Sequence, residues 1–181
     1  MKRIALTFIG KDRPGIIAEV SKVLFKSGCN IEDTTMTILE GEFAMITIAS
    51  VPTVQIEKKL KTVLRQIGKK LGLNHFLNVV KSDRLRQKHP VGSKTYVVSV
   101  MGKDRTGIVY ETSQILARAG LNITDLNSKI LGAGDKAIYA MVLEVDLPKG
   151  FNLNKLDPAW RRLRQKLHVD VHTKPLEHLS F

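Results

Sequence analysis

Cysteine and long apolar runs are both scarce in this sequence. Its 181 residues include one cysteine, Cys29, so no internal disulfide can form and a reducing compartment is expected. The first apolar run, residues 4–9, is too short for the core of a signal peptide and is typical of a strand. No apolar run approaches the roughly 20 residues that a membrane-spanning helix needs. We therefore expect a soluble, cytoplasmic protein.

Aromatic residues are also few, at 6% of the chain. RNA-recognition motifs have the same order of strands and helices that is derived below for this chain, and they stack bases on aromatic side chains of their two central strands. Here the run 43–50 has no aromatic residue after Phe43, and the run 4–9 has only Phe8. The scarcity of aromatic residues therefore argues against an RNA-recognition motif.

The chain lacks the patterns of common catalytic and metal sites. Residues 10–12 have neither the Ser or Thr nor the upstream glycine of a phosphate-binding loop, and no Gly-x-Gly-x-x-Gly occurs. His168 and His172 are close in sequence, but two ligands do not make a metal site. Cys29 follows a predicted helix among apolar neighbours, which is typical of a half-buried core thiol. We therefore expect no enzyme activity, no metal and no cofactor.

Basic residues are in excess, with 29 Lys and Arg against 17 Asp and Glu, a net charge of +12. Such an excess concerns anionic partners and solubility, not the fold. Basic side chains gather on one side of two predicted helices, where they either contact phosphates or are simply solvated. They are Lys58, Lys61, Arg65 and Lys69 in the first helix, and Arg161, Arg162, Arg164 and Lys166 in the second. Since no helix-turn-helix pattern is evident, we expect no direct nucleic-acid binding, and any effect on transcription should need a partner protein.

A repeated segment organises the chain. Residues 10–16 read Gly-Lys-Asp-Arg-Pro-Gly-Ile, and residues 102–108 read Gly-Lys-Asp-Arg-Thr-Gly-Ile. Aligning residues 4–38 with 96–130, without a gap, gives fourteen identities in 35 positions. Two copies are too few for a solenoid, so the repeat predicts two homologous domains. The identical pairs include Glu19/Glu111, Ser21/Ser113, Gly28/Gly120, Asn30/Asn122 and Asp33/Asp125.

Each copy predicts the same order of elements. The first copy predicts strands at 4–9, 31–39, 43–50 and 75–81, a helix at 15–27 ended by Gly28, and a second helix from 51–53 onwards. The apolar stripes of its two helices are Ile16, Val20, Val23 and Leu24, and then Ile56, Leu60, Val63, Leu64, Ile67 and Leu71. The second copy predicts strands at 95–101, 122–131, 136–146 and 169–174, with helices at 107–119 and from about 157, where Pro158 suits a first turn.

The order βαββαβ, present twice, predicts the fold class. It is α+β, with two ferredoxin-like units that are each an antiparallel four-stranded sheet with helices on one face. Residues 1–82 form the first domain and residues 95–181 the second. Between them, residues 83–94 are polar and basic and contain Pro and Gly, as a linker should.

The turn that follows the first strand of each copy has the residue types of a small-molecule site. Gly10 and Gly15 free the backbone for close approach, and the helix start presents N–H groups without partners. Asp12 is placed to accept a hydrogen bond from an ammonium group. Asn30, expected on the adjacent strand, offers both a donor and an acceptor. This set suits a zwitterion such as an amino acid. The alternative is that Asp12 only caps the helix, Asn30 only ties the loop and the glycines only turn the chain.

A strand followed by Asp-Arg-Pro-Gly-Ile, a helix, Gly-x-Asn-Ile and a hairpin resembles an ACT domain. The matching segments are residues 10–16 and 29–33 in the first copy, and 102–108 and 122–125 in the second. The two-domain length, with residues 28–33 followed by Glu-Phe-Ala-Met, resembles the glycine cleavage system transcriptional repressors. ACT domains are regulatory modules that often bind amino acids at domain or subunit interfaces. Thr106 in place of Pro14 departs from the first copy, and many liganded ACT domains have Asn at the position of Asp12 and Asp104.

The resemblance implies a non-enzymatic regulator that binds a small amino acid, such as glycine or serine, at ACT-domain interfaces. It would modulate a partner protein or enzyme, as in transcriptional regulation of amino-acid metabolism, and would form a homodimer. The alternative is a basic nucleic-acid-contacting or purely protein-interaction module with no small-molecule ligand. The ligand-binding residues that the resemblance and the repeated turn imply are Asp12, Arg13, Gly15, Ile16, Asn30, Ile31, Asp104, Arg105, Gly107, Asn122 and Ile123.

Overall fold

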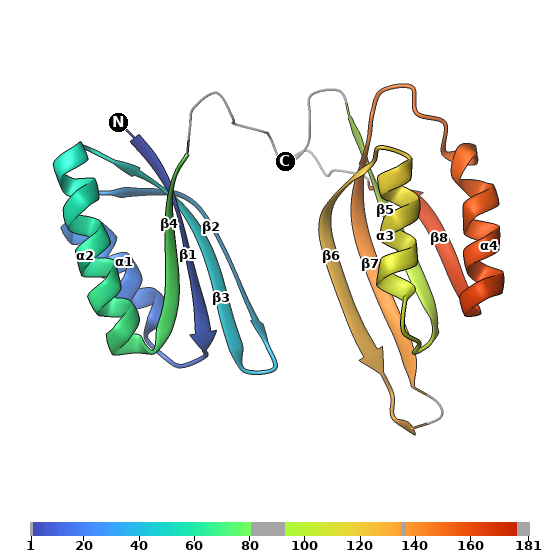
Figure 1. The fold of residues 1–181 in the computed structure, drawn as a ribbon, viewed down its shortest axis with the longest axis horizontal. Coiled ribbons are helices and arrows are strands. Elements are labelled where there is room, and N and C mark those ends of the chain that lie inside the picture. Colours follow the sequence, from blue (N-terminus) through green and yellow to red (C-terminus); the bar gives the residue numbers. More distant parts are fainter. Residues whose placement is uncertain (1, 81–92, 135–136, 177–181) are drawn as a thin grey trace. The chain divides into compact units, whose positions relative to one another are not determined.

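The computed structural model of the chain describes residues 2–80, 93–134 and 137–176 (Figure 1). The chain divides into two compact units, residues 1–85 and 86–181. The linker expected at 83–94 lies outside the described residues except at its end, where Lys94 is already the first residue of a strand. Each unit is described separately below.

The first unit is a four-stranded antiparallel sheet with two helices on one face (Figure 1). Its strands have the order β2-β3-β1-β4, so β1 lies between β3 and β4 and does not touch β2. The elements are β1 (Lys2–Lys11), α1 (Ile16–Lys26), β2 (Asn30–Leu39), β3 (Glu42–Val51), α2 (Val54–Leu71) and β4 (Leu73–Val80).

The second unit repeats this topology, with strands in the order β6-β7-β5-β8. The predicted pair of ferredoxin-like units is therefore confirmed. The elements are β5 (Lys94–Lys103), α3 (Ile108–Arg118), β6 (Asn122–Leu131), β7 (Ile138–Leu147), the 3-10 helix η3 (Leu153–Leu156), α4 (Asp157–Leu167) and β8 (Val169–Pro175).

Alternation along the strands decides which sheet face is buried. In β1, Ile4, Leu6 and Phe8 are fully buried beneath the helices. The predicted α1 stripe is buried throughout, but Val63 of the predicted α2 stripe is 36% exposed. That prediction was wrong for Val63 because a stripe that follows the 3.6-residue period is wider than the strip of helix that contacts the sheet.

The opposite face of each sheet is not covered by a helix of its own unit. In the first unit, Ile46 of β3, Thr7 of β1 and Phe76 of β4 lie side by side on this face, and Ile46 and Phe76 are 49% and 61% exposed. In the second unit, Met101 and Val142 occupy the same face and are 44% and 45% exposed. Both units therefore present exposed apolar side chains on the face opposite the helices.

Local signals in the sequence set the ends of several elements. Glu40 and Gly41 both have positive φ, 50° and 79°, as a two-residue turn between antiparallel strands requires. Gly28 follows α1 in the left-handed conformation, as predicted. Thr53 caps α2 by accepting a hydrogen bond from the backbone N–H of Ile56 at 3.2 Å.

The second helix is the element in which the units differ most. Gly10 pairs with Leu73 in the first sheet, and Gly102 pairs with Val169 in the second, so this part of the repeat is offset by 96 residues (169 − 73). With that offset, Asp157 at the start of α4 corresponds to residue 61, seven residues after the start of α2 at Val54. The helix α4 therefore lacks about two turns that α2 has, and η3 precedes it instead.

The helices of the described residues do not suit a bilayer. The longest, α2, has 18 residues but carries seven charged side chains, and none of the helices in residues 2–80, 93–134 and 137–176 combines the length and the apolar character of a membrane span.

Candidate functional site

The turn between β1 and α1 is held from two sides. The backbone N–H of Asp12 donates to the carbonyl of Gly41 at 2.9 Å, which fastens the turn to the β2–β3 hairpin. Arg13 donates from Nη2 to the carbonyl of Lys70 at 3.2 Å, in the last turn of α2, where a cation is favourable. The Asp12 carboxylate is exposed, and it has no hydrogen bond or ion pair within the described residues.

The helix that follows this turn has no side-chain cap. Its N-cap residue is Gly15, with φ at 92°, and the first intrahelical hydrogen bond runs from the N–H of Glu19 to the carbonyl of Gly15 at 3.0 Å. The N–H groups of the first turn, from Ile16 to Ala18, therefore have no acceptor within the helix. The alternative that Asp12 caps α1 is wrong, because Gly15 occupies the cap position and no side chain bonds to the cap.

The second unit repeats this arrangement. Gly107 is the N-cap residue of α3, with φ at 99° and no side-chain cap, and Glu111 donates to its carbonyl at 2.9 Å. Asp104 and Arg105 are exposed, and neither has a partner among the residues that the structure describes. Both units thus present an uncapped helix start behind an exposed carboxylate.

The glycine before each turn has a packing role. A Cβ on Gly10 would lie 2.8 Å from the carbonyl oxygen of Gly72 and 2.8 Å from Leu73 Cδ2. A Cβ on Gly102 would lie 2.8 Å from the carbonyl oxygen of His168. The backbone at the start of β4 therefore lies too close to Gly10 to leave room for a side chain, and the start of β8 lies equally close to Gly102. By contrast, no atom lies within 4 Å of a Cβ built on Gly15, so that residue is required for its positive φ.

Asn30 does not lie near Asp12 in the same unit. The expectation of an adjacent strand was wrong, because β2 neighbours β3 and not β1. Asn30 pairs with Ser50, which pairs with Arg3 at the start of β1, whereas Asp12 follows the end of β1. Nine residues of extended chain separate Arg3 from Asp12, a distance of about 30 Å.

The same separation holds in the second unit, where Asn122 pairs with Asp146 and Asp146 pairs with Thr95 near the start of β5. Each unit therefore brings the Asp, Arg and Gly of the candidate site together at one end of its sheet, and places the Asn and the following Ile at the other end. The sequence could not reveal this, because strand order is set by pairing between distant segments.

The apolar candidates divide between core and surface. Ile16 and Ile108 are each 2% exposed and belong to the cores of their units. Ile31 is 41% exposed and Ile123 is half-buried against its core. Ile16 and Ile108 therefore position the turn from beneath, and only Ile31 and Ile123 present surface that a ligand can contact.

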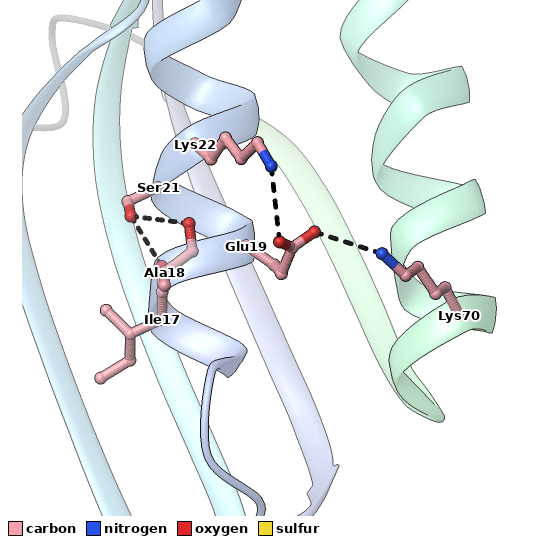
Figure 2. Close-up of polar contacts among 6 residues, drawn as sticks. All are labelled: Ile17, Ala18, Glu19, Ser21, Lys22 and Lys70. Atoms are coloured by element: carbon pink, nitrogen blue, oxygen red, sulfur yellow. Dashed lines mark hydrogen bonds and ion pairs between the residues drawn. The ribbon is translucent and has the colours of Figure 1, made fainter.

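Two residues of the repeat have structural roles that sequence reasoning did not assign. Glu19 binds Lys70 of α2 at 3.4 Å and Lys22 at 3.7 Å, which joins the two helices of the first unit (Figure 2). The positive charge of Lys22, followed by that of Lys70, lowers the pKa of Glu19. The hydroxyl of Ser21 donates to the carbonyl of Ile17 at 2.7 Å (Figure 2).

The second unit contains the same two contacts. Glu111 binds Lys166 of α4 at 2.7 Å, and Ser113 donates to the carbonyl of Val109 at 2.8 Å. The sequence did contain a signal for these two contacts, because the glutamate and the serine are each identical in the two copies. The identity of these residues in the two copies is explained by a helix–helix ion pair and by a hydrogen bond from a serine hydroxyl to a carbonyl one turn earlier in the same helix. Neither contact requires a ligand.

Several of the predicted basic residues have partners within their own unit. Lys61 binds Glu57 at 3.3 Å, Lys166 binds Glu111, and Arg164 donates to the carbonyl of Val171 in β8. His168 ends α4 in the left-handed conformation, with φ at 53°, where the first unit has Gly72. On both helices, therefore, some of the predicted basic residues are already bound within their own unit and are not free to contact an anionic partner.

Cys29 is half-buried against the first core, as predicted, and burial raises the pKa of its thiol. Among residues 2–80, 93–134 and 137–176, no three His, Cys, Asp or Glu side chains gather closely enough to hold a metal ion. A cavity of about 630 Å³, here called the α3–α4 groove, lies between those two helices of the second unit. It contains none of the candidate ligand-binding residues.

Comparison with known proteins agrees with this geometry. The ACT domain family model matches twice, at residues 2–77 and 94–174. The glycine cleavage system transcriptional repressor of Escherichia coli is 24% identical over 92% of this chain and 86% of its own length. A UPF0237 protein of Methanococcus maripaludis is 32% identical over its entire length, which covers 50% of this chain.

A crystal structure of an unknown protein from Galdieria sulphuraria has the same fold along nearly the whole chain. Its TM-score is 0.78 with 23% sequence identity, and the match covers 97% of this chain and 99% of that one. The two family matches fall on the two βαββαβ units described above. The chain therefore belongs to the ACT domain family, with two ACT units in tandem.

Proposed function

We propose that this chain is a non-enzymatic regulatory protein that binds a small amino acid at its ACT units and thereby changes its affinity for a partner protein. Such a change cannot exceed the difference between the ligand's affinities for the two states of the regulator. The proposed ligand is glycine or serine, and the proposed setting is the cytoplasm. The relationship to a protein named a glycine cleavage system transcriptional repressor supports a role in transcriptional regulation of amino-acid metabolism.

The observation that carries this proposal is the uncapped helix start in both units. Gly15 and Gly107 leave the first-turn N–H groups without a side-chain cap, whereas Thr53 caps α2. N–H groups of this kind, at the positive end of a helix dipole, suit a carboxylate. Asp12 lies three residues before Gly15, with a carboxylate suited to an ammonium group. Together these groups complement the two charges of an amino acid.

The proposed site needs two ACT units. Because Asp12 and Asn30 lie at opposite ends of one sheet, a single unit cannot place both against one small ligand. A second ACT unit in antiparallel orientation, from the same chain or from another copy, would bring its own Asn30 or Asn122 to the Asp12 end. Binding would then favour one arrangement of units over another, which supplies the signal to a partner.

The first test is a thermal-shift screen of the full chain with the twenty amino acids, because a ligand that binds only the folded state raises its melting temperature. Asp12→Ala should lower the affinity for the amino acid that emerges by about 10- to 150-fold, because it removes a charge-assisted hydrogen bond to the ammonium group. Titration calorimetry on the wild type and the variant measures this ratio.

Asp104→Ala is the matched control in the second unit. We expect a smaller effect there, because Pro14 fixes the backbone before Gly15 whereas the second unit has Thr106. If no amino acid raises the melting temperature, or if Asp12→Ala binds as tightly as the wild type, the proposal is wrong and the repeated turn serves the fold alone.

A further inference from the structure

The α3–α4 groove of the second unit combines an apolar floor with a basic rim. It is lined by Ile115 of α3, by Ala119 just after α3 and by Leu163 of α4, and Phe151 lies at the end where η3 begins. Its volume of about 630 Å³ is within the range of protein binding sites. None of the residues implied by the repeated turn contributes to it.

The groove follows from differences between the two units. Ala159 of α4 corresponds, by the 96-residue offset, to Val63 of α2, and Ala119 corresponds, by the 92-residue offset of the repeat, to Ser27. The helix α4 also begins about two turns later than α2. The smaller side chain of Ala159 and the shorter helix favour space between α3 and α4, although both helix pairs are joined by the same Glu–Lys ion pair.

The unpaired charges on the rim of the groove are all positive. Glu111, the one acidic side chain of the lining, is already bound to Lys166 at 2.7 Å. Arg118, Lys155 and Arg162 also line the groove, and none has an ion pair or hydrogen bond within the part of the chain that the structure describes. The corresponding residue to Arg162 in the first unit is the uncharged Gln66. Three unpaired cations thus border an apolar floor, an arrangement that repels cationic partners and attracts acidic ones.

We infer that the α3–α4 groove is the docking site for an acidic amphipathic helix of a partner protein. The inference names the surface on which the regulator would bind its partner protein. It rests on the proposed function only in assuming that such a partner exists, and it does not depend on amino-acid binding. A helix with apolar residues on one side would cover Ile115, Ala119 and Leu163. Acidic residues flanking that stripe would meet Arg118 and Arg162.

The dimensions of the groove match such a helix. Its lining extends from Glu111 to Ala119 along α3 and from Lys155 to Lys166 through η3 and α4. At 1.5 Å per residue these stretches are about 12 Å and 16 Å, which is two to three turns of an opposing helix. Phosphates of a nucleic acid would meet the cations but would leave the apolar floor uncovered, so an acidic peptide satisfies both features of the site.

The test uses the full chain and a phage-displayed peptide library in the absence of added amino acids. Enriched peptides should carry apolar residues at i, i+3 or i+4, and i+7, with flanking Asp or Glu. A fluorescein-labelled copy of the strongest peptide is then titrated with the wild type and with Arg118→Glu/Arg162→Glu. Fluorescence anisotropy should show affinity about tenfold or more weaker for the variant, and weaker wild-type binding as salt is raised.

The matched control is Lys26→Glu/Arg65→Glu. It changes the net charge by the same amount on exposed sites of the first unit, and Lys26 occupies the position of Arg118 in the repeat. The control should bind the peptide like the wild type, and melting curves should show both variants folded. Failure to enrich acidic amphipathic peptides, or equal loss in both variants, would overturn the inference. The surface would instead be assigned to nucleic acid if no peptide were selected and if the wild type and the control bound a DNA duplex while Arg118→Glu/Arg162→Glu did not.

Discussion

Single residues in the repeated segment are identical for different physical reasons. Gly10 and Gly102 are required because another strand passes too close for a Cβ, whereas Gly15 and Gly107 are required for positive φ. Glu19 and its counterpart join two helices. The side chain of Asp12, like that of Asp104, has no structural partner among the described residues, and the proposed ligand would supply one. Sequence identity alone could not separate these causes, since each depends on contacts between distant segments.

Thr112 is a buried polar residue whose contribution to stability can be tested by a single substitution. Its side chain is fully buried, and its hydroxyl has no hydrogen-bond partner among the described residues. The first unit has Val20 at the equivalent position, 1% exposed. Thr112→Val should therefore raise the free energy of unfolding of the second unit by about 1 kcal/mol, because it removes an unsatisfied buried hydroxyl without changing the shape.

Urea unfolding followed by fluorescence measures this change, since Trp160, the single tryptophan, lies in the core of the second unit. The reverse substitution, Val20→Thr, should destabilise the first unit by a similar amount, as followed by circular dichroism. A less stable Thr112→Val variant would mean that the hydroxyl has a partner after all.

At the scale of elements, the sequence predicted the type and order of the α-helices and strands, but neither the 3-10 helix η3 nor which strands are neighbours. Periodicity identified the strands and helices, and Gly28 and the Glu40–Gly41 turn were assigned correctly because their chemistry is local. The start of the second helix of the second unit near Asp157 was predicted from Pro158. The separation of Asn30 from Asp12 was not foreseen, because it depends on β2 pairing with β3, and the groove beside α4 was not foreseen either.

The attachment of α2 to β1 should depend on pH. Glu57 of α2 has a side chain only 8% exposed and binds Lys2 of β1 at 3.2 Å. The hydrogen bond from Lys2 lowers the pKa of Glu57 below its ordinary value. The folded state therefore binds this proton less readily than the unfolded state, so the contact stabilises the fold above the ordinary carboxylate pKa and is lost as pH falls through the folded value.

Glu57→Gln should lower the free energy of unfolding near pH 7 by up to about 1 kcal/mol, since Lys2 is partly exposed. The difference from the wild type should shrink toward zero in acid. Denaturant unfolding at a series of pH values measures it. Lys2→Met should reproduce part of the loss, because Lys61 also binds Glu57 at 3.3 Å, and the double variant should lose little more than Glu57→Gln alone. A difference that persists unchanged in acid would show that the ion pair is not its cause.

At the scale of the whole molecule, the uncovered sheet faces predict association. Ile46 and Phe76 of the first unit are exposed on the face without helices, and Met101 and Val142 lie on the same face of the second. Burial of such apolar surface is favourable, and open sheets also need their edges covered. We therefore expect the units to pair, within the chain or between chains, and the chain to form a homodimer of about 40 kDa, twice the 20.2 kDa of the chain.

Light scattering over a range of concentrations measures this mass. Ile46→Lys/Phe76→Lys should shift the equilibrium toward monomer, and Val54→Lys, at a side chain of α2 that is 45% exposed, should not. A wild type that is monomeric at every concentration would contradict the expectation.

The central claim is that an amino acid binds at the uncapped helix start with its carboxylate on the backbone N–H groups after Asp12. The most direct measurement is a ¹H–¹⁵N NMR titration of the full chain with the amino acid that gives the largest thermal shift. The account predicts that the largest saturable shifts occur at the amides of Ile16, Ile17 and Ala18 and at Asn30, and that Asp12→Ala weakens them. Saturable shifts elsewhere with these amides unmoved, or no shifts with any amino acid, would contradict it.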